Sequence, residues 1–357
     1  MKIVVYGPGR RTGALVGDRI VDLNRAYASY ARQRRDGPAD AAAAADERVP
    51  SDLERLIARG QPGLDDAQAA LAWLAERGGQ ADDSQVSLPQ AGAVLHAPSV
   101  FRPRIACAGA NYVQHLVGTQ AALQGQQVDP QEALRQSRAA GPWGFWKVVV
   151  DLRGDGEEVI YPGRARLFDY EGEVAVVFGR GGADIPAERA ADAIWGVCLL
   201  NDWSIRSDMG PPRPLSFNLA KNFTSSVSLG PCIVVGELDP QDVVVETRVN
   251  GEVRQHYSSR EMTFSFGELI AFLSRDFTFL PGDILAGGTG AGTAMDSSPR
   301  GPNGYASTER FLKPGDVVEV SAPGIGALRN QIVAKAAAGP APAGAGAAGA
   351  AGSTPAV

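Results

Sequence analysis

The segment Leu167–Gly179, LFDYEGEVAVVFG, decides the predicted fold and the position of the predicted site. Its apolar run Val174–Phe178 predicts a buried strand, and Glu171 and Glu173 stand just before that run. Side chains two residues apart in a strand point to one face, so we expect these carboxylates roughly 7 Å apart at the edge of a core. Two like charges in that position need a counter-charge or a metal ion.

A third carboxylate ends the next apolar strand. The run Trp195–Leu200 is followed by Asn201 and then by Asp202. Carboxylate oxygens are the ligands that small hard cations prefer, so Glu171, Glu173 and Asp202 predict a site for Mg²⁺ or Mn²⁺.

Composition excludes several classes of protein. With 44% apolar and 21% charged residues the chain is typical of globular domains. No apolar run approaches the roughly 18 residues of a membrane span, and MKIVVYG predicts a strand rather than a signal peptide, so we expect a cytoplasmic protein without a membrane partner. The net charge of -6 and the pI near 5.3 argue against a nucleic-acid partner. The three cysteines lie far apart in apolar sequence and are predicted to be buried free thiols.

Composition also divides the chain into three parts. Residues 1–98 are predicted to form a small N-terminal domain with short strands and two helices, closed by a polar linker. Residues 99–335 contain many short strands separated by Gly and Pro turns and are expected to hold the catalytic site. Residues 336–357, almost entirely Ala, Gly and Pro, predict a disordered tail.

Polar residues interrupt the apolar pattern at several strand ends. Tyr112 and His115 lie in GANYVQHLVG, a predicted junction of strand and helix, where functional side chains often collect. Residues 119–142 predict a helical segment that either covers the site as a lid or lies on the surface. The aromatic sequence PWGFWK follows and ends in Lys147.

Three further polar residues are candidates for binding an anion. Arg206 lies four residues after Asp202, and its spacing fits either a structural partner for a carboxylate or a clamp for a carboxylate substrate. Lys221 is predicted in a polar loop, and Thr289 supplies a hydroxyl where the strand of PGDILAGGTGAG ends. Asn250-Gly251 predicts a tight hairpin turn, and Ser265 with Glu268 predicts a capped helix.

Seven segments in this order resemble the fumarylacetoacetate hydrolase family, from about Arg104 to Gln331. They are GANYVQH, DYEGEVAVV, NDWSIR, AKNF with LGP, VNGEVRQ, LPGDILAGGTGAG and FLKPGDVVEV. The resemblance implies an α+β, mainly β fold: the mixed β-roll of the family's C-terminal domain, preceded by a small β-rich N-terminal domain. It also implies a homodimer and a role in the catabolism of aromatic compounds.

The resemblance also assigns roles to residues. Glu171, Glu173 and Asp202 match the ligands of Mg²⁺ or Mn²⁺. Arg206, Lys221 and Thr289 match positions that face substrate oxygens, and Tyr112 and Lys147 are added as candidate substrate-binding residues. His115 matches the histidine that activates water, and Lys221 is a second catalytic candidate.

Two departures from the family pattern affect these assignments. Many small members have a glutamate three residues after the histidine, where this chain has Gly118. Either another acid replaces it, with Glu132 as the candidate, or water activation is weak. Met209 replaces a glutamine. Together with Trp143, Phe145 and Trp146 it suggests that the substrate carries an apolar or aromatic acyl group, unless these side chains only pack within the protein.

The expected activity is metal-dependent hydrolysis of a carbon-carbon bond in a 1,3-dicarbonyl or 2-oxo acid substrate, such as an acylpyruvate or fumarylacetoacetate, through a metal-stabilised enolate. The alternative enzyme is a decarboxylase, dehydratase or isomerase of a 2-oxo acid, which needs no water and which the loss of the glutamate favours. A non-catalytic binding protein is the third possibility, and the retained carboxylates argue against it.

Overall fold

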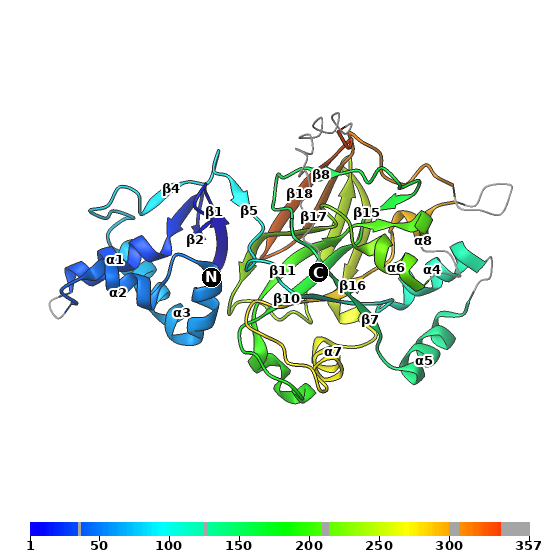
Figure 1. The fold of residues 1–357 in the computed structure, drawn as a ribbon, viewed down its shortest axis with the longest axis horizontal. Helices are drawn as coiled ribbons and strands as arrows, with labels where there is room; N and C mark the ends of the chain where they lie inside the picture. The colour runs from blue at the N-terminus through cyan, green and yellow to red at the C-terminus, as the bar shows by residue number, and fades with distance from the viewer. Residues whose placement is uncertain (35–36, 125–127, 209–213, 300–306, 337–357) are drawn as a thin grey trace, which may run out of the picture.

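The computed structural model describes residues 1–34, 37–124, 128–208, 214–299 and 307–336. In these ranges the chain forms a sheet-rich α+β fold without a closed barrel (Figure 1). The strands form sheets of eleven, five and two strands. The predicted fold class is therefore confirmed.

The bounds of the elements are as follows. The eleven-stranded sheet contains β1 (Lys2–Tyr6), β2 (Arg11–Val16), β3 (Arg19–Asp22), β4 (Ser87–Pro89), β5 (Leu95–His96), β6 (Ile105–Ala108), β7 (Gly144–Lys147), β10 (Gly172–Phe178), β11 (Ile194–Asp202), β13 (Val227–Val234) and β16 (Ile284–Thr289). The smaller sheets contain β8 (Val159–Ile160), β14 (Val244–Val249), β15 (Glu252–Ser258), β17 (Val317–Ala322) and β18 (Gly326–Val333), and β9 (Phe168–Asp169) with β12 (Ser204–Ile205). The α-helices are α1 (Leu23–Gln33), α2 (Ala41–Arg48), α3 (Leu53–Glu76), α4 (Val113–Gln124), α5 (Pro130–Ala140), α6 (Pro214–Lys221), α7 (Phe266–Leu273) and α8 (Ala294–Ser297).

Strand β10 lies inside the large sheet and is buried on both faces. It pairs antiparallel with β11 on one side and with β16 on the other. Ala175 and Val177 belong to a core cluster that also contains the apolar faces of α1 and α3, whereas Val174 and Val176 belong to a second cluster shared with β14, β17 and α7. An apolar strand between two cores explains the continuous run that follows the two glutamates.

The N-terminal region is joined to the rest of the chain through the large sheet. Strand β1 pairs antiparallel with β13, with Lys2 opposite Val234. The described part of this region holds three helices beside its strands, and Gly60 (φ 59°, ψ -144°) interrupts α3 with a non-helical conformation. The division at residue 98 stays a prediction, and most of the predicted disordered tail, residues 337–357, lies outside the described residues.

Local signals elsewhere are confirmed. The hairpin of β14 and β15 turns at Asn250 (φ 53°) and Gly251 (φ 84°), as the primed turn of this dipeptide requires. Ser265 and Glu268 form the predicted capping box of α7. Within the described ranges, every helix is too short or too polar to cross a membrane. The homodimer and the cytoplasmic location stay predictions.

Candidate active site

Glu171, Glu173 and Asp202 lie together at the end of the paired strands β10 and β11. Each is buried and offers one ligand atom, and these three oxygens lie within 4.8 Å of one another. Glu171 is placed next to Asp202 because its carbonyl accepts the Asp202 N–H at 2.9 Å. Three buried carboxylate oxygens this close together could hold a divalent metal ion, which takes oxygen ligands.

Two buried lysines compensate two of these carboxylates. Lys221, at the end of α6, donates to Glu171, to Asp202 Oδ2 at 2.7 Å and to Ser204 Oγ at 2.7 Å. Lys147, on β7, donates to the other oxygen of Asp202 and to the Ser226 carbonyl at 2.7 Å. Because both ammonium groups are buried, their charges are little screened by solvent.

Glu171 and Glu173 differ in how their negative charge is compensated, and their pKa values shift in opposite directions. Burial alone would raise the pKa of Glu171, but the charges of Arg206 and Lys221 bring it well below its usual value, so Glu171 stays ionised. Burial, followed by the charges of Asp202 and Glu171, raises the pKa of Glu173. Glu173 accepts the Gly288 N–H at 3.0 Å, a weaker compensation than an ammonium group.

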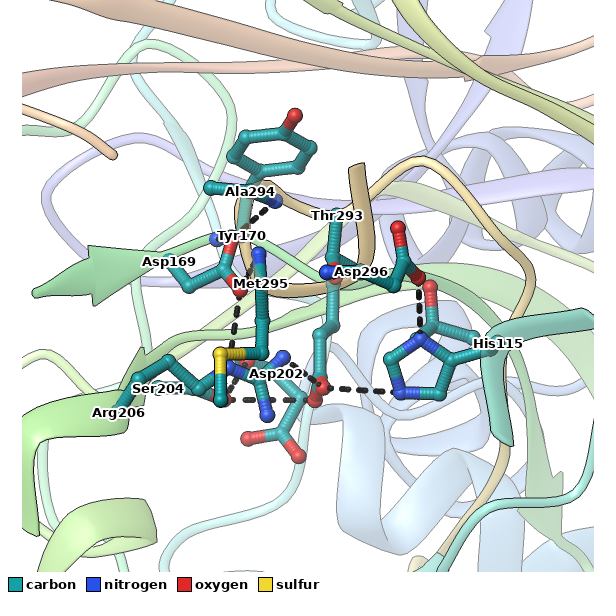
Figure 2. A network of polar contacts seen from close by, with 12 residues as sticks. His115, Asp169, Tyr170, Asp202, Ser204, Arg206, Thr293, Ala294, Met295 and Asp296 are labelled. Atoms are coloured by element: carbon teal, nitrogen blue, oxygen red, sulfur yellow. Dashed lines mark hydrogen bonds and ion pairs between the residues drawn. The ribbon is translucent and has the colours of Figure 1, made fainter. Parts of the chain in front are cut away.

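Arg206 links the triad to a carboxylate that the sequence analysis missed. Its Nε donates to Asp169 at 2.9 Å, and a second nitrogen donates to Glu171. Asp169 also accepts the N–H groups of Ala294 at 2.7 Å and Met295 at 3.0 Å, the first residues of α8 (Figure 2). The signal was available, because Asp169 precedes Glu171 by two residues in the same alternating stretch.

His115 forms a pair with Asp296 on the other side of the site (Figure 2). It lies in the first turn of α4, its Nδ1 is 2.6 Å from Asp296 Oδ2, and its Nε2 is 3.8 Å from Glu171 Oε1. The other Asp296 oxygen accepts the Gly292 N–H at 2.8 Å. When Nδ1–H donates to Asp296, the lone pair on Nε2 is directed toward the carboxylate side of the cavity.

The acid beside His115 is therefore Asp296, and Glu132 lies elsewhere. Glu132 is on α5, its side chain is 42% exposed, and it bonds Arg135. A Cβ atom built on Gly118 would lie 2.7 Å from the Cβ of Asp296, so Asp296 fills the space beside Gly118, where the family resemblance predicts a glutamate. The segment GAGTAMDSS contains no periodic signal for this role, which explains why sequence reasoning missed it.

A cavity of about 300 Å³ brings most of the predicted residues together. It is lined by the three carboxylates and by His115, Arg206, Lys221, Thr289, Ala108, Gly109, Ala110, Leu116, Thr119, Trp143, Phe145 and Phe217. Thr289 lies opposite Glu173 in the sheet, and its hydroxyl donates to the Gly172 carbonyl at 2.9 Å and accepts from Gln255 at 2.7 Å.

Lys147 and Tyr112, both predicted to bind substrate, are not among the described residues that line the cavity. The three N–H groups of Lys147 are used by Asp202, Ser226 and the Trp203 carbonyl at 3.4 Å, so it has no donor left for a substrate. Tyr112 is buried and packs edge-on against Tyr257, with ring centroids 4.9 Å apart. Trp146 packs on Phe277 rather than on the cavity, and Met209 lies outside the described residues.

The chain is similar to known proteins over most of its length. The profile of the family described as fumarylacetoacetate (FAA) hydrolase C-terminal matches residues 104–333. Oxaloacetate tautomerase YisK of Bacillus subtilis is 32% identical over 291 residues, covering 80% of this chain and 88% of that protein. The human mitochondrial oxaloacetate tautomerase FAHD2B is 29% identical, covering 81% of this chain and 82% of that protein.

Solved structures share the fold. Fumarylacetoacetate hydrolase from Exiguobacterium antarcticum has a TM-score of 0.65 and 25% identity, covering 94% of this chain and 100% of that one. The 2-hydroxyhepta-2,4-diene-1,7-dioate isomerase from Mycobacterium marinum has a TM-score of 0.54 and 29% identity, covering 72% of this chain and 84% of that one. Since the family profile spans the chain from β6 to β18, this chain belongs to the fumarylacetoacetate hydrolase family.

Proposed function

We propose that this chain is a divalent-metal-dependent hydrolase that cleaves a carbon-carbon bond in a 2,4-dioxo acid of the acylpyruvate type. The observation that supports hydrolysis most is the His115–Asp296 pair, which faces the carboxylate triad across one cavity. A histidine whose tautomer is fixed by a carboxylate is the usual general base for water.

Each side of the cavity has its own part in this reaction. His115 Nε2 accepts a proton from water, while Asp296 holds Nδ1–H and stabilises the imidazolium that forms. Arg206 and Lys221 offset the negative charge of the carboxylates at the inner end, so a bound divalent cation would make that end favourable for an anionic substrate. A divalent cation held by Glu171, Glu173 and Asp202 would polarise substrate oxygens as a Lewis acid.

The proposed cleavage needs no reactant other than the substrate and one water molecule. The oxygen of water bonds to the acyl carbonyl carbon, and the bond from this carbon to the adjacent methylene carbon breaks with its electron pair on the methylene side. The proton taken by His115 Nε2 then neutralises that carbon. The products are one carboxylic acid from the acyl part and one 2-oxo acid.

A cleavage assay tests this proposal. The protein is incubated with Mg²⁺ and 2,4-dioxo acids in water enriched in ¹⁸O, and both products are followed by mass spectrometry. We expect one acid and one 2-oxo acid in equal amounts, with one ¹⁸O in the new carboxylate, and no turnover after chelation of the metal. Failure to cleave acetyl-, benzoyl- and fumarylpyruvate alike would overturn the hydrolase proposal.

A second candidate activity is the keto-enol tautomerisation of a 2-oxo acid. The Bacillus subtilis and human relatives are both named oxaloacetate tautomerases, and they align over four-fifths of this chain. The same His115 could move a proton between carbon and oxygen without water. Faster loss of the enol absorbance of oxaloacetate, with all four carbons retained and no carbon dioxide released, would favour this activity; carbon dioxide release would indicate decarboxylation instead.

A further inference from the structure

We propose that the acyl end of the substrate is an uncharged aromatic group, selected by an aromatic wall that consists of Trp143, Phe145 and Phe217. This inference rests on the proposed function, because it assigns the part of the substrate that lies beyond the oxo acid. All three side chains line the cavity that contains the carboxylate triad.

The aromatic wall runs from the charged inner end of the cavity to its mouth. Lys221 Nζ lies 5.1 Å from the centroid of the Phe145 ring, and the Phe145 and Phe217 centroids are also 5.1 Å apart. The Trp143 ring follows at 6.0 Å from Phe217 and is 51% exposed. A substrate whose oxo-acid end lies near Lys221 would therefore extend its acyl group along these rings.

Backbone structure fixes the rings in place. Phe145 lies on β7 opposite Cys107 of β6, and Phe217 lies one helical turn before Lys221 on α6. Trp143 lies on Gly109, where a Cβ atom would come within 2.5 Å of the indole, and the Gly109 N–H donates to the Trp143 carbonyl at 2.9 Å. The absence of a side chain at Gly109 is what admits the indole to the cavity wall.

The charges of the cavity point to an uncharged acyl group. Among its described lining residues the lysine and arginine side chains are Lys221 and Arg206, and both contact Glu171 at the inner end. A second carboxylate at the far end of a substrate would face the rings and find no counter-charge among the described lining residues. A phenyl group would instead bury apolar surface and make edge or stacking contacts with the rings.

A binding experiment tests the aromatic wall independently of catalysis. Two 2-oxo acids that cannot undergo the cleavage, 2-oxo-4-phenylbutanoate and 2-oxohexanedioate, are titrated into the full-length Mg²⁺-loaded protein by calorimetry. We expect the phenyl compound to bind at least about tenfold more tightly. Tighter or equal binding of the dioate would overturn the proposal.

Single-residue variants test whether the aromatic wall causes the preference for the phenyl compound. Phe217→Ala should weaken the binding of the phenyl compound about tenfold and change the binding of the dioate less than about twofold. Phe101→Ala is the matched control, because Phe101 is 77% exposed and lies outside the cavity lining. It should change the affinity for neither ligand. An equal loss for both ligands in Phe217→Ala would mean that the ring supports the fold and does not select the ligand.

A charge-introducing variant covers the case in which Phe217→Ala does not fold. Trp143→Arg changes a half-exposed side chain and should raise the affinity for the dioate while lowering that for the phenyl compound. An unchanged ratio would show that the acyl group does not reach the rings. The two proposals fail separately: absence of cleavage overturns the hydrolase, whereas cleavage or binding without phenyl preference overturns only the aromatic wall.

Discussion

The two sides of the active site are held by different kinds of structure. The carboxylates of the triad lie at the ends of β10 and β11 inside the eleven-stranded sheet, each strand paired on both sides. The His115–Asp296 pair lies between the first turn of α4 and the four-residue helix α8. The first side is fixed by a continuous hydrogen-bonded sheet, and the second depends on the packing of two separate helices.

In the proposed mechanism the strand side, with the carboxylate triad, binds the cation, and the helix side, with the His115–Asp296 pair, transfers protons. Asp169 connects them, because it accepts from Arg206 on the strand side and from two N–H groups of α8. Variants on the strand side should therefore remove cation binding. Variants on the helix side should leave cation binding intact and lower turnover.

The largest effect is expected for Glu173→Gln. Removing this charge should lower kcat/KM about 10⁴-fold, because Lewis-acid stabilisation amounts to several kcal/mol. Glutamine still accepts the Gly288 N–H, so the melting temperature without metal should change little. Steady-state kinetics measure the loss of kcat/KM. Calorimetric scans with and without Mg²⁺ measure the melting temperature, and the stabilisation by Mg²⁺ should disappear.

Asp202→Asn should differ from Glu173→Gln in its effect on stability. It should also abolish stabilisation by Mg²⁺, but it leaves Lys147 buried without its carboxylate and should cost about 3 kcal/mol of unfolding free energy. If Mg²⁺ still raises the melting temperature of both variants as in the unmodified protein, the triad is not the cation site.

His115→Ala should lower kcat about 10³-fold, since general base catalysis contributes on that scale. In contrast to Glu173→Gln, it should retain the full stabilisation by Mg²⁺, because His115 is not a member of the triad. Single-turnover kinetics together with thermal scans measure the two properties. Turnover within threefold of the unmodified protein would place the proton transfer elsewhere and favour a reaction without water activation.

Asp296→Asn should lower kcat about 10²-fold, because an amide can donate to Nδ1 and so favour the wrong tautomer of His115. As a positioning residue, Asp296 should also alter the pH profile of kcat, which a purely structural residue would not. Glu132→Gln is the matched control and should retain activity within about twofold, since Glu132 bonds Arg135 on the surface. The opposite ranking of these two variants would restore Glu132 as the partner.

The strand side was predictable from sequence and the helix side only in part. Glu171, Glu173 and Asp202 follow from period-2 geometry and from their place at strand ends, which are local signals. The contact of His115 with Asp296 joins residues 181 apart in the chain, and only the packing of α4 on α8 creates it. Glu132 is near His115 in the sequence, but α5 holds it at the surface.

Tertiary packing limits the other predictions in the same way. Lys147 has the residue type of an anion-binding group, yet burial turns its three donors toward protein oxygens. The strands of the first 98 residues follow from their apolar runs, whereas the pairing of Lys2 with Val234, which merges them with the large sheet, has no local signal.

A smaller loss of activity than for Asp296→Asn is expected when the acid is moved from α8 to α4. Gly118 and Asp296 are neighbours, and a side chain at 118 would place its Cβ 2.7 Å from that of Asp296, so the two acids exclude each other. Gly118→Glu alone should disturb the pair, and Asp296→Gly alone should remove it. Their combination relieves the crowding and should restore kcat/KM to within about tenfold of the unmodified protein, giving a positive coupling in the double-mutant cycle. If the double variant is as slow as Asp296→Gly, then the helix side requires an acid on α8, and the position of the carboxylate matters as much as its presence.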